Sequence, residues 1–319
     1  MADLDRRGFL AAGAALALSG CVSGTEFAGG GRRPRPPRTG GIGGTGIVGT
    51  LTELGSIVVN GLRIELDDRT AISDAFGPLA ADSLTPGLSL TVEAEREVED
   101  GPLIARRVQV TRPVIGTVTG SGNDLRVAGV PVRLLPGVAQ PAPGSRVAVS
   151  GLWNGTTVVA SRLDPAGSGP DILAGDVGLA SGGIPLVGGR PILGPAARFV
   201  PMPVAFATLI GRATPEGFAA DQISLGRFAG SVTALEALSV EGYLEPAPTA
   251  PGFAISGLGH SFDPAARLAS FEGRSLFVGP YTGTFDVALG LPLPEEARAR
   301  RALLSPGFDP LTAGARPAR

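Results

Sequence analysis

Three stretches of the sequence repeat the same succession of short apolar segments separated by turns. They span residues 47–66, 114–134 and 173–193, and a second apolar pair follows each of them, at 88–110, 145–164 and 202–225. Each copy carries a dipeptide suited to a tight hairpin turn with positive φ, namely Asn60-Gly61, Ala128-Gly129 or Gly188-Gly189. The repetition therefore predicts a chain built from similar units of about 60 residues and about five strands each.

The rest of the composition also favours strands. The chain holds 49 Gly and 29 Pro, and Pro spread this widely excludes long helices over most of its length. Residues 90–95 alternate apolar and polar side chains, as in a strand with one wet face. Only residues 293–304 read as a helix, because Pro294, Glu295 and Glu296 precede a run of arginines.

Five short strands in a flat sheet would expose unpaired edges, so each unit is expected to curl into a small barrel. We therefore predict an all-β fold of tandem OB- or SH3-like barrels with one short C-terminal helix. The pattern of turn glycines and core aliphatics, including V-N-G and A-x-x-V, resembles a domain family of unknown function, DUF5666, which occurs in bacterial exported proteins, often in tandem. The resemblance covers 44–110 and extends through 111–166, and it implies a fold but no catalytic residue.

The first 21 residues resemble a lipoprotein export signal. Arg6 and Arg7 precede an apolar run at 9–18, which has the length of a signal-peptide core and is too short to span a bilayer. Leu18-Ser19-Gly20-Cys21 resembles a lipobox, which implies cleavage before Cys21 and lipid attachment to it. The paired arginines resemble the twin-arginine motif, although Sec export stays open. A buried N-terminal helix is the structural alternative.

The segment after Cys21 is predicted to be a disordered Gly/Pro/Arg-rich tether. Four arginines in it could favour anionic lipid headgroups or merely keep it soluble. Val22 resembles the residue that follows the lipidated cysteine in lipoproteins sent to the outer membrane. The predicted organisation is a signal peptide at 1–20, the tether at 21–43, β-domains at 44–112, 113–168 and 169–230, a divergent or partial fourth at 231–292, and a helix and tail at 293–319.

The sequence offers few groups for chemistry. His260 is the only histidine, so a multi-histidine metal site is excluded in one chain. Its neighbour Ser261 would point to the opposite face of a strand, which disfavours a catalytic pair. The alternating acids Glu93, Glu95, Glu97 and Glu99 are expected to form the wet face of a hairpin, with calcium binding as the alternative. We predict no catalytic, cofactor-binding or metal-binding residue.

Nucleic-acid binding is not expected, because acidic residues outnumber arginines from residue 44 onward and aromatics make up 5% of the chain. The aromatic residues are expected mainly in the core, with stacking on sugars as the alternative; they are Trp153, Phe199, Phe206 and Tyr243. The sequence thus favours a non-enzymatic lipoprotein on the periplasmic side of the outer membrane, with a membrane contact through its lipid. It would act as a scaffold or binding module for an envelope protein or glycan. The alternative is a protein that binds or processes an envelope polysaccharide in an acidic and aromatic groove.

Overall fold

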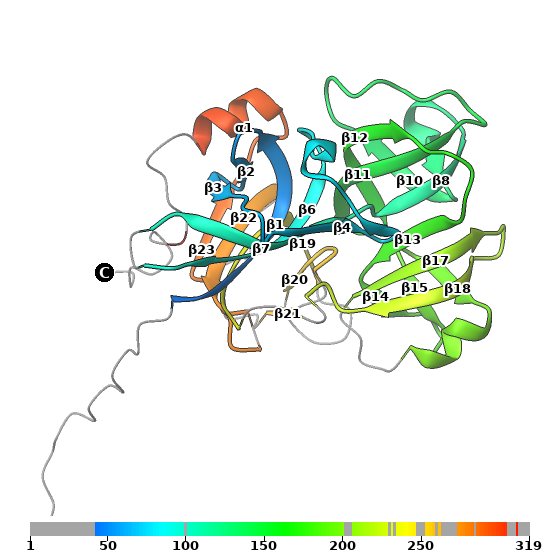
Figure 1. Ribbon diagram of the computed structural model, residues 1–319. Helices are drawn as coiled ribbons and strands as arrows, with labels where there is room; N and C mark the ends of the chain where they lie inside the picture. The colour runs from blue at the N-terminus through cyan, green and yellow to red at the C-terminus, as the bar shows by residue number, and fades with distance from the viewer. Residues whose placement is uncertain are drawn as a thin grey trace, which may run out of the picture. The chain divides into compact units, whose positions relative to one another are not determined.

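In the computed structural model the chain divides into two units, Met1–Thr39 and Gly40–Arg319. The structure describes residues 42–98, 101–200, 206–228, 231, 234–246, 253–258, 261–262, 273–283, 285–304 and 311, all of them in the second unit. These residues are mostly β-strand, and α1 (Ala297–Leu303) is a short helix near the C-terminal end. The predicted all-β class with a short C-terminal helix is confirmed (Figure 1).

The first barrel is a closed ring of five strands. Its strands are β1 (Ile42–Glu53), β2 (Ile57–Val59), β3 (Leu62–Glu65), β6 (Ser89–Arg96) and β7 (Leu103–Val110). β1 pairs antiparallel with both β2 and β6, β2 pairs with β3, β3 runs parallel to β7, and β7 returns to β6. The pairing closes on itself, so the strands of this ring protect one another's edges. A small hairpin, β4 (Ala71–Asp74) and β5 (Gly77–Pro78), lies between β3 and β6 in the chain, and η1 (Ala81–Ser83) follows it.

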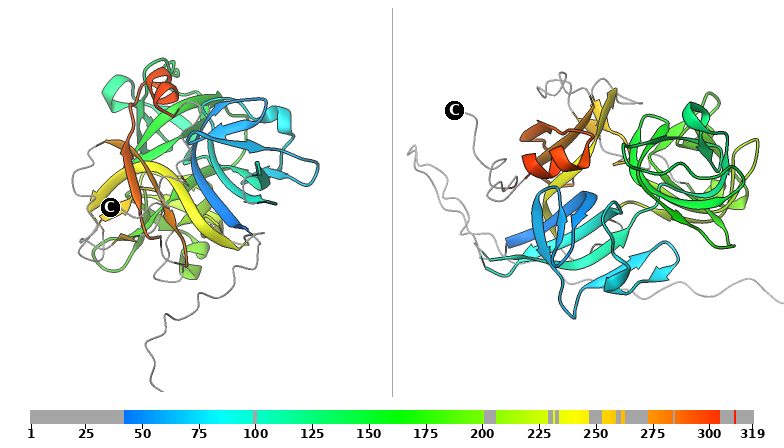
Figure 2. Two further views of the ribbon diagram at one scale, coloured as in Figure 1. Left: turned by 90° about the vertical axis from the view of Figure 1, so that its left-hand side faces the viewer. Right: turned by 90° about the horizontal axis from the view of Figure 1, so that it is seen from above.

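The same order of pairing recurs twice, in the strands that Figure 2 draws in green and yellow-green. The second barrel consists of β8 (Val114–Thr119), β9 (Arg126–Val127), β10 (Val130–Leu134), β11 (Arg146–Asn154) and β12 (Thr157–Pro165), with η2 (Gly122–Asp124) before β9. The third consists of β13 (Asp171–Gly175) with β14 (Val177–Leu179), β15 (Pro185–Val187), β16 (Arg190–Leu193), β17 (Ala207–Ala213) and β18 (Phe218–Leu225), with η3 (Pro195–Phe199) after β16. In both, the third segment of the ring again runs parallel to the last.

A β-bulge at the same place in each barrel explains the A-x-x-hydrophobic pattern. In each barrel the register of the last antiparallel strand pair shifts by one residue, just after Ala105, Ala160 or Ala220. The residue that follows each of these alanines therefore has no partner on the neighbouring strand. In β7 the extra residue changes which positions of the strand face the core: the odd-numbered Leu103 and Ala105 are buried before the bulge, and the even-numbered Val108 and Val110 are buried after it. The extra residue bends the strand, which helps a five-stranded sheet to close.

The predicted hairpin turns are confirmed in all three barrels. Asn60-Gly61 and Ala128-Gly129 both adopt positive φ at the two turn positions, with angles of 57° and 79° in the first turn and 50° and 77° in the second. These turns join β2 to β3 and β9 to β10. Two positive φ angles match the twist of a two-residue hairpin.

The second and third barrels share one hydrophobic core, in which Trp153 of the second reaches the third. A Cβ added at Gly175 would lie 2.8 Å from Trp153 Nε1, and one at Gly188 would clash with the same indole ring. The indole Nε1 donates a hydrogen bond to the carbonyl of Ala174 at 2.8 Å. Two glycines of the third barrel thus make room for a side chain of the second. β13 also pairs with β8, which joins the two rings through backbone hydrogen bonds.

The C-terminal sheet comprises β19 (Leu235–Pro246), β20 (Phe253–Ile255), β21 (Ser261–Phe262), β22 (Arg274–Pro280) and β23 (Leu289–Pro292). β19 runs parallel to β1, so this sheet continues the first barrel, as the yellow and orange strands beside the blue β1 show in Figure 2. The pairings of these described strands do not close a ring. Helix α1 begins one turn later than predicted, because Glu296 is its N-cap and accepts hydrogen bonds from the backbone N–H groups of Arg298 and Ala299.

Candidate functional site

The residues predicted to direct export lie outside the described part of the chain. These are Arg6 and Arg7, the lipobox residues Leu18, Ser19 and Gly20, and the lipid attachment residue Cys21. The same holds for Val22, the tether arginines and His260. The roles assigned to them therefore remain predictions.

Three of the four aromatic candidates for sugar stacking are buried. Trp153, Phe206 and Tyr243 have exposed fractions of 4%, 3% and 2%. Trp153 packs against Gly175 and Gly188 of the third barrel, and the Tyr243 hydroxyl donates to Glu295 Oε1 at 2.9 Å. The side chain of Phe199 lies outside the described set. As predicted, these three rings pack in the interior, so they present no flat aromatic face to a ligand.

The acids on and just after β6 differ in their exposure to solvent. Glu95 and Glu97 are accessible, with side-chain exposed fractions of 34% and 55%, whereas that of Glu93 is 1%. Glu93 forms an ion pair with Arg107 and accepts a hydrogen bond from the hydroxyl of Ser231 at 2.8 Å. The expectation of a solvated face was wrong for Glu93, which is buried in contact with Arg107 and Ser231.

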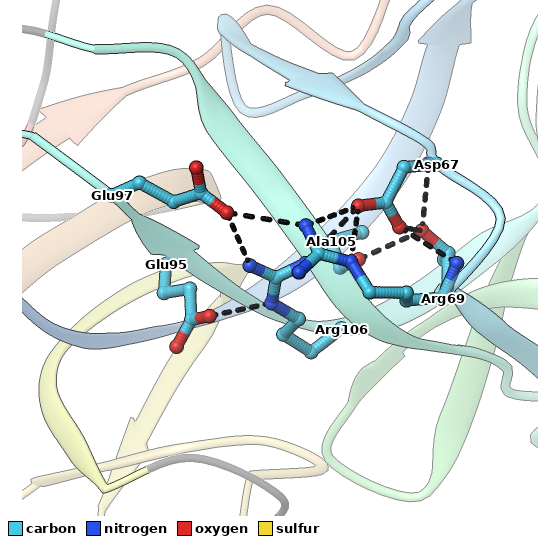
Figure 3. A network of polar contacts seen from close by, with 7 residues as sticks. Asp67, Arg69, Glu95, Glu97, Ala105 and Arg106 are labelled. Atoms are coloured by element: carbon cyan, nitrogen blue, oxygen red, sulfur yellow. Dashed lines mark hydrogen bonds and ion pairs between the residues drawn. The ribbon is translucent and has the colours of Figure 1, made fainter.

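The outer charge network joins Asp67, Arg69, Glu95, Glu97 and Arg106 on the first barrel (Figure 3). Arg106, the residue at the bulge of β7, reaches Glu95 at 2.5 Å, Glu97 at 3.1 Å and Asp67 at 3.2 Å. Arg69 bridges Asp67 and Glu97 at 2.9 and 3.1 Å. Hydrogen bonds from Arg69 and Arg106 lower the pKa of Glu97. Two arginines thus hold three carboxylates together on the first barrel.

Nearby, an open depression of about 240 Å³ lies on the face of the first barrel formed by β3 and the β6–β7 connection. Its charged lining residues are Arg63, Glu65 and Arg96. Arg63 donates to Ser56 Oγ at 2.8 Å, and Arg96 donates to the carbonyl of Gly101 at 2.5 Å. OB-type five-stranded barrels bind oligonucleotides and oligosaccharides on the corresponding face, over strands 2 and 3 and the loop between strands 4 and 5.

The junction charge network links the first barrel to the C-terminal sheet through Thr50, Glu241, Arg274 and Arg300. The Glu241 carboxylate accepts from the Thr50 N–H at 2.8 Å and from Arg274 Nε at 2.8 Å, and Arg300 Nε lies 3.4 Å away. The exposed fraction is 0% for the Arg274 side chain and 2% for that of Glu241. Burial raises the pKa of Glu241, but Arg274 and Arg300 outweigh it and hold the pKa below its ordinary value.

Sequence reasoning missed this network, since Glu241 looks like an ordinary outward-facing residue of an alternating strand. A second contact extends it to the second barrel, where Arg133 binds both oxygens of Glu295 at 2.5 and 2.8 Å. The hydrogen bond from Arg133 lowers the pKa of Glu295 to about 2. The partners are far apart in the chain, so no local motif marks them.

A buried acid and an arginine both bind the backbone of Gly257, the acid at its N–H and the arginine at its carbonyl. Asp176, at the break between β13 and β14, accepts from the Gly257 N–H at 2.6 Å. Arg227 donates to the Gly257 carbonyl through Nε at 3.2 Å and Nη2 at 2.6 Å. Burial raises the pKa of Asp176 to about 7. In the described part of the chain, Asp176 Oδ1 has no hydrogen-bond partner.

Among the described residues, no three His, Cys, Asp or Glu side chains are grouped so that they could hold a metal ion. None of the helices in that same part of the chain combines the length and apolarity of a membrane span.

These observations define an all-β protein that contains closed five-stranded barrels of the OB-like kind. Residues 45–109 match a family described as a domain of unknown function, DUF5666. The match begins in β1 and ends in β7, so the family segment coincides with the first barrel. No curated protein and no solved structure matches the chain.

Proposed function

We infer that the chain is an exported lipoprotein that carries three tandem DUF5666-type barrels as a non-enzymatic scaffold or binding module in the cell envelope. The lipobox at 18–21 supports attachment of lipid to Cys21, with the tether at 21–43 between the anchor and the barrels. The proposed location is the periplasmic side of the outer membrane, which Val22 favours. The partner is an envelope protein or glycan.

One observation carries the binding role: the polar depression on the first barrel lies on the face that OB-type barrels use for extended ligands. Its charged residues Arg63 and Glu65 belong to β3 and are exposed, so a partner can reach them without rearrangement of the ring. The junction charge network supports a scaffold role, because it fixes the first barrel against the C-terminal sheet.

The anchor is tested with Cys21→Ala in the full chain, expressed in a bacterium that processes lipoproteins. We expect wild type to incorporate labelled palmitate and to fractionate with membranes, and the variant to lose both properties while staying folded. Ser23→Ala is the matched control, because it lies just past the lipobox and should behave as wild type. Membrane fractionation and labelling that persist in Cys21→Ala would refute the anchor.

The binding face is tested in the same strains with a photo-crosslinking residue at Arg63. We expect adducts in the wild-type background and far fewer when Cys21→Ala releases the protein from the membrane. A crosslinker at the exposed Asp82, outside the depression, is the control and should give background labelling. Equal labelling from both positions would argue against this face as the binding surface.

A further inference from the structure

A cavity of about 160 Å³ lies where the first and third barrels meet. The β4–β5 hairpin, seen beside β13 in Figure 1, contributes Asp74 and Ala75 to it, and Ala75 packs on the apolar cluster around Ile172 and Phe206. Since a cavity needs about 10–15 Å³ to hold one water, this cavity can hold several waters or one small organic or inorganic ion.

Arg227 lines this cavity and brings a positive charge that the described residues leave without an ion pair. Its guanidinium stacks over the Phe206 ring, 4.3 Å from the centroid. Three N–H bonds are used, two to the Gly257 carbonyl and one from Nη1 to Thr91 Oγ1 at 3.0 Å. A guanidinium has five N–H donors, so one on each of Nη1 and Nη2 stays available.

Arg227 carries its positive charge at neutral pH. Burial lowers its pKa, but only to about 10, and the negative charge of Asp176 opposes that effect. Asp176 does not come within ion-pair distance of Arg227, and its own hydrogen bond goes to the Gly257 N–H. A partly buried cation whose partners are a carbonyl and a hydroxyl is costly unless an anion joins it.

Neutral donors surround the same cavity. The side chains of Gln109, Thr208 and Ser224 line it, and none of them forms a hydrogen bond within the part of the chain that the structure describes. Hydroxyl and amide groups of this kind donate to the oxygens of a carboxylate or phosphate group. They come from β7, β17 and β18, so a ligand here would contact both barrels.

Two other charged residues line the cavity, Arg112 and the acidic residue Asp74. Arg112 pairs with Asp164 at 2.9 Å, and the Asp74 carboxylate accepts from the Phe76 N–H at 2.8 Å. We propose that this cavity is a binding site for a small oxyanion, a carboxylate or phosphate group, with Arg227 as its charged anchor. The proposal rests on the inferred role of the chain as a binding module but does not depend on the lipid anchor. It also names a class of ligand, which the depression on the first barrel does not define.

Isothermal titration of the full chain in detergent tests the site. Inorganic phosphate and sodium acetate are titrated separately at constant ionic strength, with sodium chloride as the reference. We expect saturable binding of one anion per chain, lowered about tenfold or more in Arg227→Gln, because a charge-assisted hydrogen bond is lost. Binding of phosphate alone would assign a phosphate-bearing ligand, and binding of acetate alone a carboxylate.

Arg112→Gln is the matched control, since Arg112 lines the same cavity but already forms an ion pair with Asp164, which also binds Arg162. We expect it to keep most of the affinity. Ser224→Ala provides a second test if Arg227→Gln does not fold, because Ser224 is exposed and its loss should weaken binding several-fold without affecting the core. No saturable binding of either anion to wild type, or equal binding by wild type, Arg227→Gln and Ser224→Ala, would overturn the site. Neither result affects the palmitate-labelling test, so the two proposals fail separately.

Discussion

The outer charge network on the first barrel and the junction charge network between that barrel and the C-terminal sheet use the same chemistry in opposite surroundings. In the outer network (Figure 3) the Arg69 and Glu97 side chains are 62% and 55% exposed, so water competes with the ion pair between them, and Arg106 is 14% exposed. In the junction network the Arg274 and Glu241 side chains are 0% and 2% exposed. The number of ion pairs is therefore a poor guide to what each network contributes.

The difference lies in what happens when one partner is lost. An exposed acid whose arginine is removed is solvated again, so an exposed pair contributes little to stability. A buried acid that loses its arginine keeps its desolvation cost with less compensation. We therefore expect the junction network to determine whether the first barrel and the C-terminal sheet stay together, and the outer network to adjust only the local conformation.

The largest effect is predicted for Arg274→Met, which keeps an apolar stem but leaves the Glu241 carboxylate with only Thr50 and Arg300. We expect a loss of about 3–5 kcal/mol in the free energy of unfolding, the range for breaking a buried ion pair. Urea unfolding followed by circular dichroism measures it. The double variant Arg274→Met with Glu241→Leu should recover part of the loss, because it removes the stranded charge. A double variant less stable than Arg274→Met alone would contradict this account.

A smaller, pH-dependent effect is predicted for Asp176→Asn. The pKa of Asp176 is raised to about 7 in the folded chain by burial and by Glu245, against Arg227, whereas its ordinary value is 3.8. The folded state therefore binds the proton more tightly, and the stability contributed by this group falls as pH rises from about 4 to 7. An amide can still accept from the Gly257 N–H but does not titrate.

We expect Asp176→Asn to match wild type near pH 4 and to be more stable by about 1–3 kcal/mol at pH 8. The measurement is the urea midpoint of both proteins at each half pH unit from 4 to 8. Only the difference between the two curves is interpreted, since other acids titrate in both proteins. A difference that does not change with pH would show that Asp176 is ionised throughout.

The sequence predicted the barrels well because their determinants are local. The Asn60-Gly61 and Ala128-Gly129 turns, the short apolar strands and the helix near residue 297 all depend on neighbouring residues. The bulge was also visible, as an A-x-x-hydrophobic pattern in every copy, although its structural meaning emerged only from the register. Local preference and global fold agree in these segments.

The contacts between barrels could not be predicted, because their partners are distant and their residue types are ambiguous. Glu93 and Glu95 occupy equivalent positions in an alternating strand, yet only Glu93 is buried, in contact with the distant Ser231. Glu241 and Arg274 likewise look like surface residues until β1 and β19 pair. Trp153 shows the same difficulty, since nothing in the sequence pairs it with Gly175 and Gly188, where a Cβ would meet its indole ring.

The smallest effect is predicted for Arg106→Met in the outer network, which is the same substitution as at Arg274. Arg106 contacts three acids, but Arg69 still bridges Asp67 and Glu97 when it is lost, and Glu95 regains water. We expect the urea midpoint to move by a small fraction of the shift seen for Arg274→Met. Adding sodium chloride to about 1 M should remove most of that difference, because the screening length then falls to about 3 Å. The Arg274→Met shift should persist at the same salt concentration, since ions do not reach a buried pair. Equal shifts for the two variants, or equal sensitivity to salt, would mean that exposure does not separate the two networks.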